Sequence, residues 1–310
     1  MSWSFSAHRA FRACQRKWYF DEKVAAPRAT KQPLRREVYL LSKLQGLEGW
    51  RGSLVDSILS DYVIKSIANR RALSLPETMH IARDQFDRQV AFARAHRLRE
   101  PNLKVGDHKG EFAAWRAIEY GADVSDDELE TCWVEVQQSL TNFYDLPTLW
   151  SILRTHERLI AQRTLSCTVS DVAVKATPDL IVFRRGRPPL IIDWKTYVKD
   201  SRDHRLQLAC YAIALTACKA HADFPSTVSR YHATDIELLE VQLITKKLRP
   251  YSLTDEDIDE VEEFITESAL QIELAASAST NTEFAPEKYP VAHSPVTCSF
   301  CQFQALCWKG

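Results

Sequence analysis

Apolar residues recur at helical spacing through the first half of the chain. The first helix is expected to start after a Ser6 cap and to place Phe11, Cys14 and Trp18 on one face. A later helix begins at Gly52 and carries a continuous apolar arc. The pattern predicts helices over residues 6–24, 52–71, 76–98 and 125–144, with a basic, proline-containing loop over residues 27–37.

Alternating apolar and polar positions begin after residue 157 and predict strands. A long amphipathic helix, with Thr254 as its cap, follows the last of them. Strands are predicted over residues 172–176, 179–183, 190–195 and 240–245, with a turn over 184–189 and helices over 203–221 and 252–277. This order favours an α/β fold in which helices flank a small mixed sheet.

The composition supports a folded, helix-rich chain. Of 310 residues, 45% are hydrophobic and 26% charged, which excludes disorder for the bulk of the chain. Only 8 residues are glycine, so tight turns are few and an all-β fold is disfavoured. No apolar run approaches the ~18 residues that span a bilayer, and the first 20 residues lack a signal-peptide core. We expect a cytoplasmic protein with reduced thiols and no membrane contact.

The net charge of −1 hides an uneven distribution. Residues 1–110 carry 21 basic and 11 acidic side chains, and residues 111–150 carry 1 and 9. Residues 151–210 carry 11 basic and 6 acidic side chains, and residues 211–310 carry 7 basic and 15 acidic ones. Solvated helix faces explain such runs most simply, but the alternation leaves room for a basic face that binds nucleic acid.

A carboxylate–lysine cluster is the first candidate for chemistry. Asp193 and Lys195 are two residues apart on an apolar strand, so they share one face of it. A hairpin about residue 187 would place Asp179 across from Lys195 and diagonal to Asp193. Asp56 lies at the edge of an apolar helix face, where its carboxylate can reach into a cleft.

Metal-assisted hydrolysis of phosphodiesters suits this cluster. Carboxylates are hard ligands for Mg²⁺ or Mn²⁺, which polarise a phosphoryl oxygen and lower the pKa of an attacking water. Lys195 would position that water or stabilise charge in the transition state. The alternative is a structural ion pair across a hairpin, because the D-x-K pattern alone is common.

The cysteines form a second candidate site. Cys298, Cys301 and Cys307 follow a C-x₂-C-x₅-C pattern typical of metal ligands, within a proline-punctuated tail. Cys14, in a basic and aromatic segment, is the best fourth ligand. Zn²⁺ and an iron–sulfur cluster both accept four thiolates, and the spacing does not separate them. The other four cysteines are expected to be core thiols: Cys132, Cys167, Cys210 and Cys218.

Six motifs in order resemble the RecB-like PD-(D/E)XK nucleases, in particular the iron–sulfur branch with the AddB nuclease domain and the CRISPR-associated exonucleases. The resemblance spans residues 2–307. The motifs are SFSAHRAFRACQRKWYF, GSLVD, ATPDLIVF, IIDWKTY, LQLACYAIAL and CSFCQFQALC.

The resemblance implies a role for each matched position. Asp179 and Asp193, helped by the Trp194 carbonyl, would ligate the catalytic Mg²⁺ or Mn²⁺, with Lys195 as catalytic lysine. The helix with the Q-x-x-x-Y motif would help orient DNA through Gln207 and Tyr211. A 4Fe–4S cluster would be held by the same four thiols, Cys14, Cys298, Cys301 and Cys307.

One departure concerns the metal site, since Asp56 stands where the branch has a histidine. Asp is a good ligand for hard cations, so activity is expected, although the branch's Mn²⁺ preference need not carry over. The resemblance also divides the chain into four parts. These are N-terminal helices (1–70), a helical insertion (71–155), the catalytic core (156–275) and the iron–sulfur tail (276–310).

These observations predict a Mg²⁺- or Mn²⁺-dependent deoxyribonuclease. The sequence contains no phosphate-binding loop of a helicase, so a partner helicase or other DNA-processing protein would supply unwinding. Single-stranded or frayed DNA ends are then the expected substrate, and an exonuclease in repair, recombination or CRISPR- and phage-related processing is the expected role. Two alternatives remain, a catalytically silent DNA-binding or scaffold subunit on the same fold and an unrelated zinc-stabilised protein.

Overall fold

The computed structural model describes residues 2–25, 32–100, 103–197, 202–277 and 284–307. Residues 27–31 of the predicted loop lie outside these ranges. No helix in them is both long enough and apolar enough to cross a bilayer.

Helices occupy most of the first half of the chain and also its end. Those before the sheet are α1 (Phe5–Ala13), α2 (Gln15–Tyr19), α3 (Pro33–Leu41), α4 (Leu47–Ile58), α5 (Lys65–Ala68), α6 (Leu75–Arg94), α7 (Arg116–Glu119), α8 (Asp126–Tyr144) and α9 (Pro147–Arg154). Later ones are α10 (Arg202–Ala217), α11 (Asp255–Ala276), α12 (Pro295–Ser299) and α13 (Gln304–Cys307). Two π-helical segments, η1 (Phe20–Val24) and η2 (Leu59–Ile64), continue α2 and α4.

A five-stranded sheet stands at the centre of the fold, with strand order β1-β4-β5-β6-β7. Only β5 and β6 are parallel, so the sheet is mixed as predicted. Its strands are β1 (Arg158–Ala161), β4 (Leu180–Phe183), β5 (Leu190–Lys195), β6 (Glu237–Gln242) and β7 (Lys247–Tyr251). A separate hairpin pairs β2 (Leu165–Val169) with β3 (Val172–Ala176).

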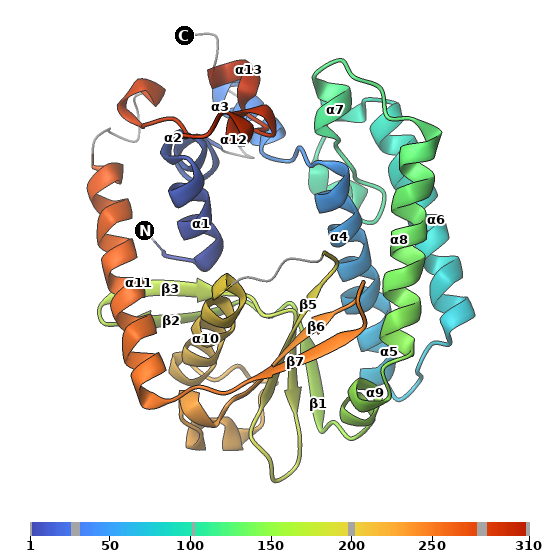
Figure 1. Ribbon diagram of the computed structural model, residues 1–310, viewed down its shortest axis with the longest axis vertical. Helices are drawn as coiled ribbons and strands as arrows, with labels where there is room; N and C mark the ends of the chain where they lie inside the picture. The colour runs from blue at the N-terminus through green and yellow to red at the C-terminus, as the bar shows by residue number, and fades with distance from the viewer. Residues whose placement is uncertain (1, 26–31, 101–102, 198–201, 278–283, 308–310) are drawn as a thin grey trace.

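Two hydrophobic cores cover the two faces of the sheet. Ile191 of β5 packs in one core, together with residues of α1, α10 and α11. Ile192 and Trp194 pack in the other, with residues of α4, α6, α8 and α9. Figure 1 shows α4, α6 and α8 gathered on one side of the molecule and α1, α10 and α11 on the other. Because side chains alternate along a strand, Asp193 and Lys195 share the α10 face of β5.

Several predicted boundaries are wrong, each for a local reason. The helix over 6–24 is capped by Ser4 and breaks at Cys14, which is extended (φ −166°) and accepts a hydrogen bond from the Lys17 N–H that starts α2. The predicted loop contains α3, whose first residue Pro33 suits a helix start. The helix expected from Gly52 starts five residues earlier, at Leu47.

Shifts of the same kind affect the other elements. The helix over 76–98 ends at Arg94, and His96 just beyond it is left-handed (φ 51°). The helix over 203–221 ends at Ala217, and the strand over 240–245 is β6 at Glu237–Gln242. The sequence analysis did not predict strands β1, β2 and β7. Strand β7 contains Pro250, which has no backbone N–H to donate. An edge strand such as β7 tolerates this because the backbone on its outer side pairs with no other strand.

Candidate active site

Three carboxylates and a lysine meet at the end of β5. Lys195 Nζ lies 2.5 Å from Asp193 Oδ2, so the two side chains share a face of the strand. The backbone N–H of Trp194 donates to Asp179 Oδ2 over 2.9 Å. Its indole N–H donates to Asp56 Oδ1 over 3.0 Å. Strand β5 therefore ties together groups that come from α4, from the start of β4 and from its own end.

The register of the β4–β5 hairpin differs from the prediction by two residues. Leu180 pairs with Ile192, and one further step sets Asp179 across from Asp193 rather than from Lys195. The pairing of Leu190 with Val182 centres the hairpin on residue 186 instead of residue 187, and this accounts for the shift. Asp179 and Asp193, which the sequence analysis expected to be diagonal neighbours across the hairpin, are thus directly opposite each other.

Charge accumulates in this confined space. Burial raises the pKa of Asp179, and the charges of Asp193 and Asp56 raise it further. Burial likewise raises the pKa of Asp193, and the charge of Lys195 acts against it. Burial alone would lower the pKa of Lys195, but the adjacent Asp193 carboxylate raises it above its ordinary value. The lysine therefore stays cationic, while the raised pKa values of Asp179 and Asp193 mean that these groups bind a proton more readily than free carboxyls do.

A glutamine that the sequence did not single out bridges two of the carboxylates. Gln162, just after β1, donates from Nε2 to Asp56 Oδ1 and Oδ2 over 2.9 and 3.0 Å, and to Asp179 Oδ1 over 3.3 Å. Its backbone is left-handed (φ 50°) and donates to the Asp179 carbonyl over 3.0 Å. The partly positive amide N–H group of Gln162 therefore lies between the carboxylates of Asp56 and Asp179.

Hard oxygen donors of this kind suit Mg²⁺ or Mn²⁺. In the described ranges, no three Asp, Glu, His or Cys side chains converge closely enough to hold a metal ion. The carboxylates face protein donors instead, namely Gln162, Trp194 and Lys195. The donor set fits a divalent cation in its chemistry, and ligation requires the Gln162 amide to turn away from Asp56 and Asp179.

Helix α4 reaches this site because of a glycine. A Cβ on Gly52 would lie 2.9 Å from Thr196 Oγ1, closer than side-chain carbons come, so only glycine lets the helix approach the end of β5. Arg51 next to it is buried and donates from Nη2 to the Thr196 carbonyl over 2.8 Å. The π-helical segment η2 begins three residues after Asp56. Together these features hold the Asp56 carboxylate against Trp194.

The two residues of the Q-x-x-x-Y motif lie on α10, on the Lys195 side of β5. Gln207 Oε1 accepts a hydrogen bond from Lys195 Nζ over 3.2 Å. Its Nε2 donates to the Tyr211 hydroxyl over 2.7 Å. Burial and then the charges of Asp193 and Asp179 raise the pKa of Tyr211, so its hydroxyl stays protonated next to the carboxylates. The motif therefore orients the lysine, while contact with DNA stays a prediction.

A further buried acid lies beside β5, and the sequence analysis missed it. Glu240 on β6 is the parallel neighbour of Asp193 and is fully buried. Its carboxylate accepts hydrogen bonds from Gln242 Nε2 over 2.7 Å and from the Tyr251 hydroxyl over 3.0 Å, and His204 Nδ1 lies 3.2 Å from it. A charged residue within the apolar run LLEVQLI was the available signal, the same one that singled out Asp193.

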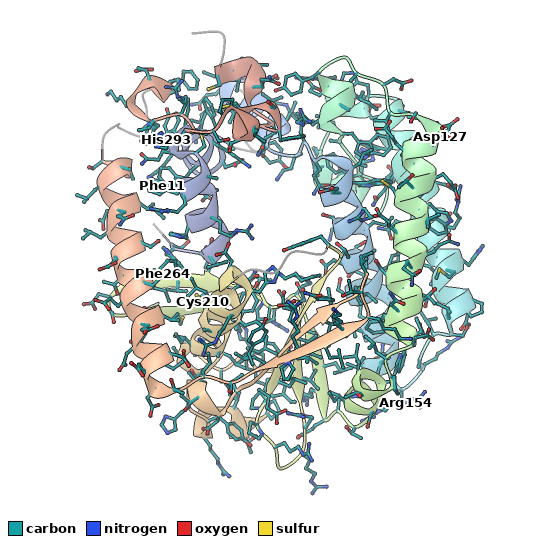
Figure 2. The ribbon with its side chains drawn as sticks, viewed as in Figure 1. Phe11, Asp127, Arg154, Cys210, Phe264 and His293 are labelled. Carbon is teal, nitrogen blue, oxygen red and sulfur yellow. The ribbon has the colours of Figure 1, made fainter. Side chains whose placement is uncertain are left out.

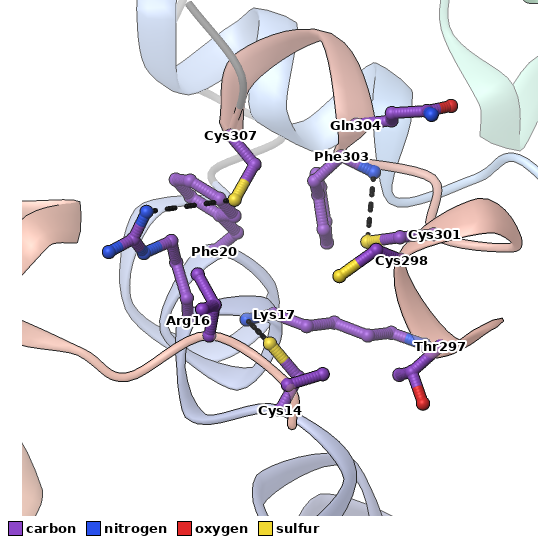
Figure 3. Close-up of a pocket in the computed structure, with 12 residues that line it drawn as sticks. Cys14, Arg16, Lys17, Phe20, Thr297, Cys298, Cys301, Phe303, Gln304 and Cys307 are labelled. Atoms are coloured by element: carbon purple, nitrogen blue, oxygen red, sulfur yellow. Dashed lines mark hydrogen bonds between the residues drawn. The ribbon is translucent and has the colours of Figure 1, made fainter. Parts of the chain in front are cut away.

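The four tail and N-terminal cysteines line one pocket (Figure 3). Cys14 comes from the junction of α1 and α2, and Cys298, Cys301 and Cys307 come from the last 13 residues of the chain. All four thiols are half-buried and free of disulfides. Figure 1 shows α12 and α13 beside α2 and α3, and the Arg16 N–H donates to the Pro290 carbonyl over 3.1 Å. The structure thus brings the two ends of the described chain together at the thiols.

Nitrogen donors surround these sulfurs. The Lys17 N–H points at Cys14 Sγ over 3.4 Å, the Phe303 N–H at Cys301 Sγ over 3.4 Å, and Arg16 Nη1 at Cys307 Sγ over 3.7 Å. Burial raises the pKa of the Cys301 thiol, and the hydrogen bond from the Phe303 N–H acts against that shift. The thiolate is the form of cysteine that binds metals. The donor set is compatible with a four-thiolate centre, although the thiols do not form a closed ligand group in the described structure.

Asp21 beside the tail has a testable effect on stability. Burial raises its pKa to about 6, so the folded chain holds this proton more tightly than the unfolded chain does. Stability therefore falls as pH rises from about 4 to about 6. We expect Asp21→Asn to be more stable than wild type at neutral pH by ~1–3 kcal/mol and equally stable near pH 4.

Urea unfolding at both pH values measures this difference. Asp107→Asn, at an exposed acid, serves as the control and should change stability little at either pH. An Asp21→Asn variant with the pH dependence of wild type would show that Asp21 does not hold a proton in the folded state.

The sequence comparison decides the family. The model of the PD-(D/E)XK nuclease superfamily matches residues 2–308. The chain belongs to this superfamily. The superfamily takes its name from an acidic residue, a second acid and a lysine, and this chain carries Asp179, Asp193 and Lys195 in that order around one hairpin. Membership in this superfamily supports a nuclease activity for the chain.

Comparisons with individual proteins add little. A solved structure named SSO0001 is 14% identical, covers 74% of this PD-(D/E)XK chain and 97% of its own, and has a TM-score of 0.32. A structure named "Putative exonuclease" from Eubacterium rectale is 10% identical, covers 70% and 82%, and has a TM-score of 0.31. No curated protein matches. At these scores the two structures carry no argument about this chain.

Proposed function

We propose that this protein is a Mg²⁺- or Mn²⁺-dependent deoxyribonuclease that hydrolyses phosphodiester bonds. The observation that carries the proposal is the cluster at the end of β5, where a buried Lys195–Asp193 pair adjoins Asp179 and Asp56. A structural ion pair needs one acid for one base, whereas here Lys195 pairs with Asp193 while burial and the charge of Asp193 raise the pKa of both Asp56 and Asp179. That surplus of carboxylate is what a cation site requires.

Each residue has a distinct part in the proposed reaction. Asp179 and Asp193, with Asp56 and the Trp194 carbonyl, would hold a divalent cation, which lowers the pKa of an attacking water and neutralises charge on the phosphoryl group. Lys195, kept cationic by Asp193, stabilises the negative charge that develops on the phosphate in the transition state. Gln207 fixes the direction of the Lys195 ammonium, and Tyr211 fixes Gln207.

We infer that the substrate is single-stranded DNA or a frayed end and that the enzyme is an exonuclease. Digestion of end-labelled single-stranded, duplex and circular DNA with EDTA, Mg²⁺ or Mn²⁺ tests this proposal. Metal-dependent loss of linear but not circular single strands is the expected result. Cleavage in EDTA, or none under any condition, would contradict it.

We further propose that Cys14, Cys298, Cys301 and Cys307 hold a 4Fe–4S cluster with a structural role, as in the iron–sulfur branch that the motifs resemble. Four thiols from both ends of the described chain in one pocket, with N–H donors on three of them, support this assignment. Such a cluster would join α2 to the tail and close a loop around almost the whole chain.

Gln162 provides a test of the cation site that does not need activity. Gln162→Ala removes the amide between Asp56 and Asp179, and because these hydrogen bonds are exposed the apo protein should lose only ~0.5–1.5 kcal/mol. Added Mg²⁺ should then raise the melting temperature of the variant more than that of wild type. Gln162→Glu should show a larger Mg²⁺ response still.

Thermal melts in EDTA and in Mg²⁺ measure these shifts. Gln137→Ala, at an exposed glutamine of α8, is the matched control and should behave as wild type. Equal Mg²⁺ responses in all four proteins would mean that no cation binds between Asp56 and Asp179.

A further inference from the structure

A polar pocket adjoins the catalytic centre on the α10 side, and no step of the proposed reaction uses it. Its volume is about 440 Å³. Its walls come from the N-terminal segment Ser2–Ser6, from the β2–β3 hairpin and from α10. Figure 2 labels Cys210, which lines the pocket from α10. We call this the N-terminal pocket.

The N-terminal pocket is continuous with the catalytic residues. Gln207 and Tyr211 form part of its wall, and the same Gln207 accepts the hydrogen bond from Lys195. The Tyr211 hydroxyl accepts a hydrogen bond from Gln207 Nε2 over 2.7 Å, so both wall residues are linked to Lys195 through one chain of hydrogen bonds. A group in the pocket therefore lies one side chain away from the phosphate on which Lys195 would act.

The walls offer hydroxyls and a single free cation. Thr164 and Thr177 hydroxyls lie 3.1 Å apart, as do those of Ser4 and Ser6. Lys175 on β3 is exposed, and within the described ranges it forms no ion pair. Hydroxyls and a lysine are the groups that bind the phosphate and sugar of nucleic acids without reading sequence.

The pocket is ordered before anything binds. The Trp3 N–H donates to the Ala173 carbonyl over 2.7 Å, and the Lys175 N–H donates to the Trp3 carbonyl over 2.8 Å. The buried Trp3 indole donates to Ser268 on α11 over 2.9 Å. Along β3, Val174 and Ala176 are buried. Because side chains alternate along a strand, Lys175 between them points outward. A ligand would meet a preformed surface, which lowers the entropy cost of binding.

We propose that the N-terminal pocket holds one unpaired nucleotide of the substrate strand, next to the phosphate that is cleaved, with Lys175 on its backbone phosphate. This inference rests on the proposed nuclease function. The volume lies in the ~300–1,000 Å³ range of small-ligand sites, which suits a nucleotide and excludes a duplex. The Glu22 carboxylate on the same wall would repel a second phosphate and can accept a hydrogen bond from the exocyclic amino group of a base. The pocket therefore selects single-stranded ends.

The test compares Lys175→Ala with Lys219→Ala, an exposed lysine just beyond the Ala217 end of α10 and therefore away from Gln207 near the start of that helix. On short single-stranded DNA, Lys175→Ala should raise KM about five- to tenfold with kcat nearly unchanged, regardless of base sequence. The salt dependence of kcat/KM should weaken by about 0.7 in its log–log slope, as for one lost phosphate contact on a single strand. Lys175→Arg should restore most of the KM.

Binding by Asp193→Asn protein, followed through the anisotropy of a labelled oligonucleotide, separates the two hypotheses. If wild type cleaves but Lys175→Ala matches Lys219→Ala in KM, salt slope and binding, the pocket does not hold the strand. If nothing cleaves but Lys175→Ala weakens single-strand binding, the pocket assignment stands and the nuclease proposal fails. Equal weakening on blunt duplex DNA would also overturn the selection of single strands.

Discussion

Asp193→Ala and Lys195→Ala are each expected to abolish metal-dependent DNA cleavage. The ammonium and the carboxylate lie 2.5 Å apart on one face of β5, and both are buried. Loss of Asp193 would remove a proposed cation ligand together with the carboxylate that raises the pKa of Lys195. Loss of Lys195 removes the charge that stabilises the phosphate in the transition state. Removing one preorganised group of this kind costs ~10²–10³ in rate, measured as kcat on end-labelled DNA.

Stability must be separated from catalysis in this experiment. Removing one partner of a buried ion pair leaves an unpaired charge, which costs ~3–5 kcal/mol. The double variant Asp193→Asn with Lys195→Met has no such charge, so it should melt closer to wild type while remaining inactive. Lys246→Ala, which breaks an exposed pair with Asp145, should retain both activity and stability. Rates near wild type in either single variant would refute the assignment of the active site.

Cys14→Ser is expected to cost the protein its metal centre and several kcal/mol of stability, or roughly 5–10 °C in melting temperature. The reason is geometric. Cys14 is the only thiol of the pocket from the N-terminal helices, so the centre would join the two ends of the described chain through this residue. The tail has few buried apolar residues of its own, Phe303 and Tyr289 among them, to hold it in place.

Anaerobically purified protein should be brown, with about four irons and four sulfides per chain if the cluster is 4Fe–4S. Substituting Cys14, Cys298, Cys301 or Cys307 should remove colour and stability together. Cys218→Ser is the matched control, since this half-buried thiol on the other side of the molecule only donates to the Leu215 carbonyl. Colourless protein with one Zn²⁺ would refute the iron–sulfur cluster but keep the link between the two ends. Metal-free protein with unchanged melting would refute both.

Local features of the fold could be predicted from neighbouring residues. Ser125 with Glu128 and Thr254 with Asp257 form reciprocal caps, and α8 and α11 start directly after them. Strands β3 and β5 have the predicted bounds. Such features depend on side chains three or four residues apart, or on alternation within one strand, so they are present in the sequence itself.

The sequence by itself also pointed to Asp179, Asp193 and Lys195 as neighbours, because a charged pair on an apolar strand demands partners. It did not point to Gln162 or Glu240, and the catalytic role of the group stays a prediction. Tertiary structure alone decided how these residues meet. The hairpin register depends on cross-strand packing, which set Asp179 beside Asp193. Gln162 meets Asp56 across 106 residues, and Glu240 meets Asp193 only because β6 pairs with β5. Contacts between distant segments come from the packing of whole elements on the sheet, and no local pattern along the chain encodes them.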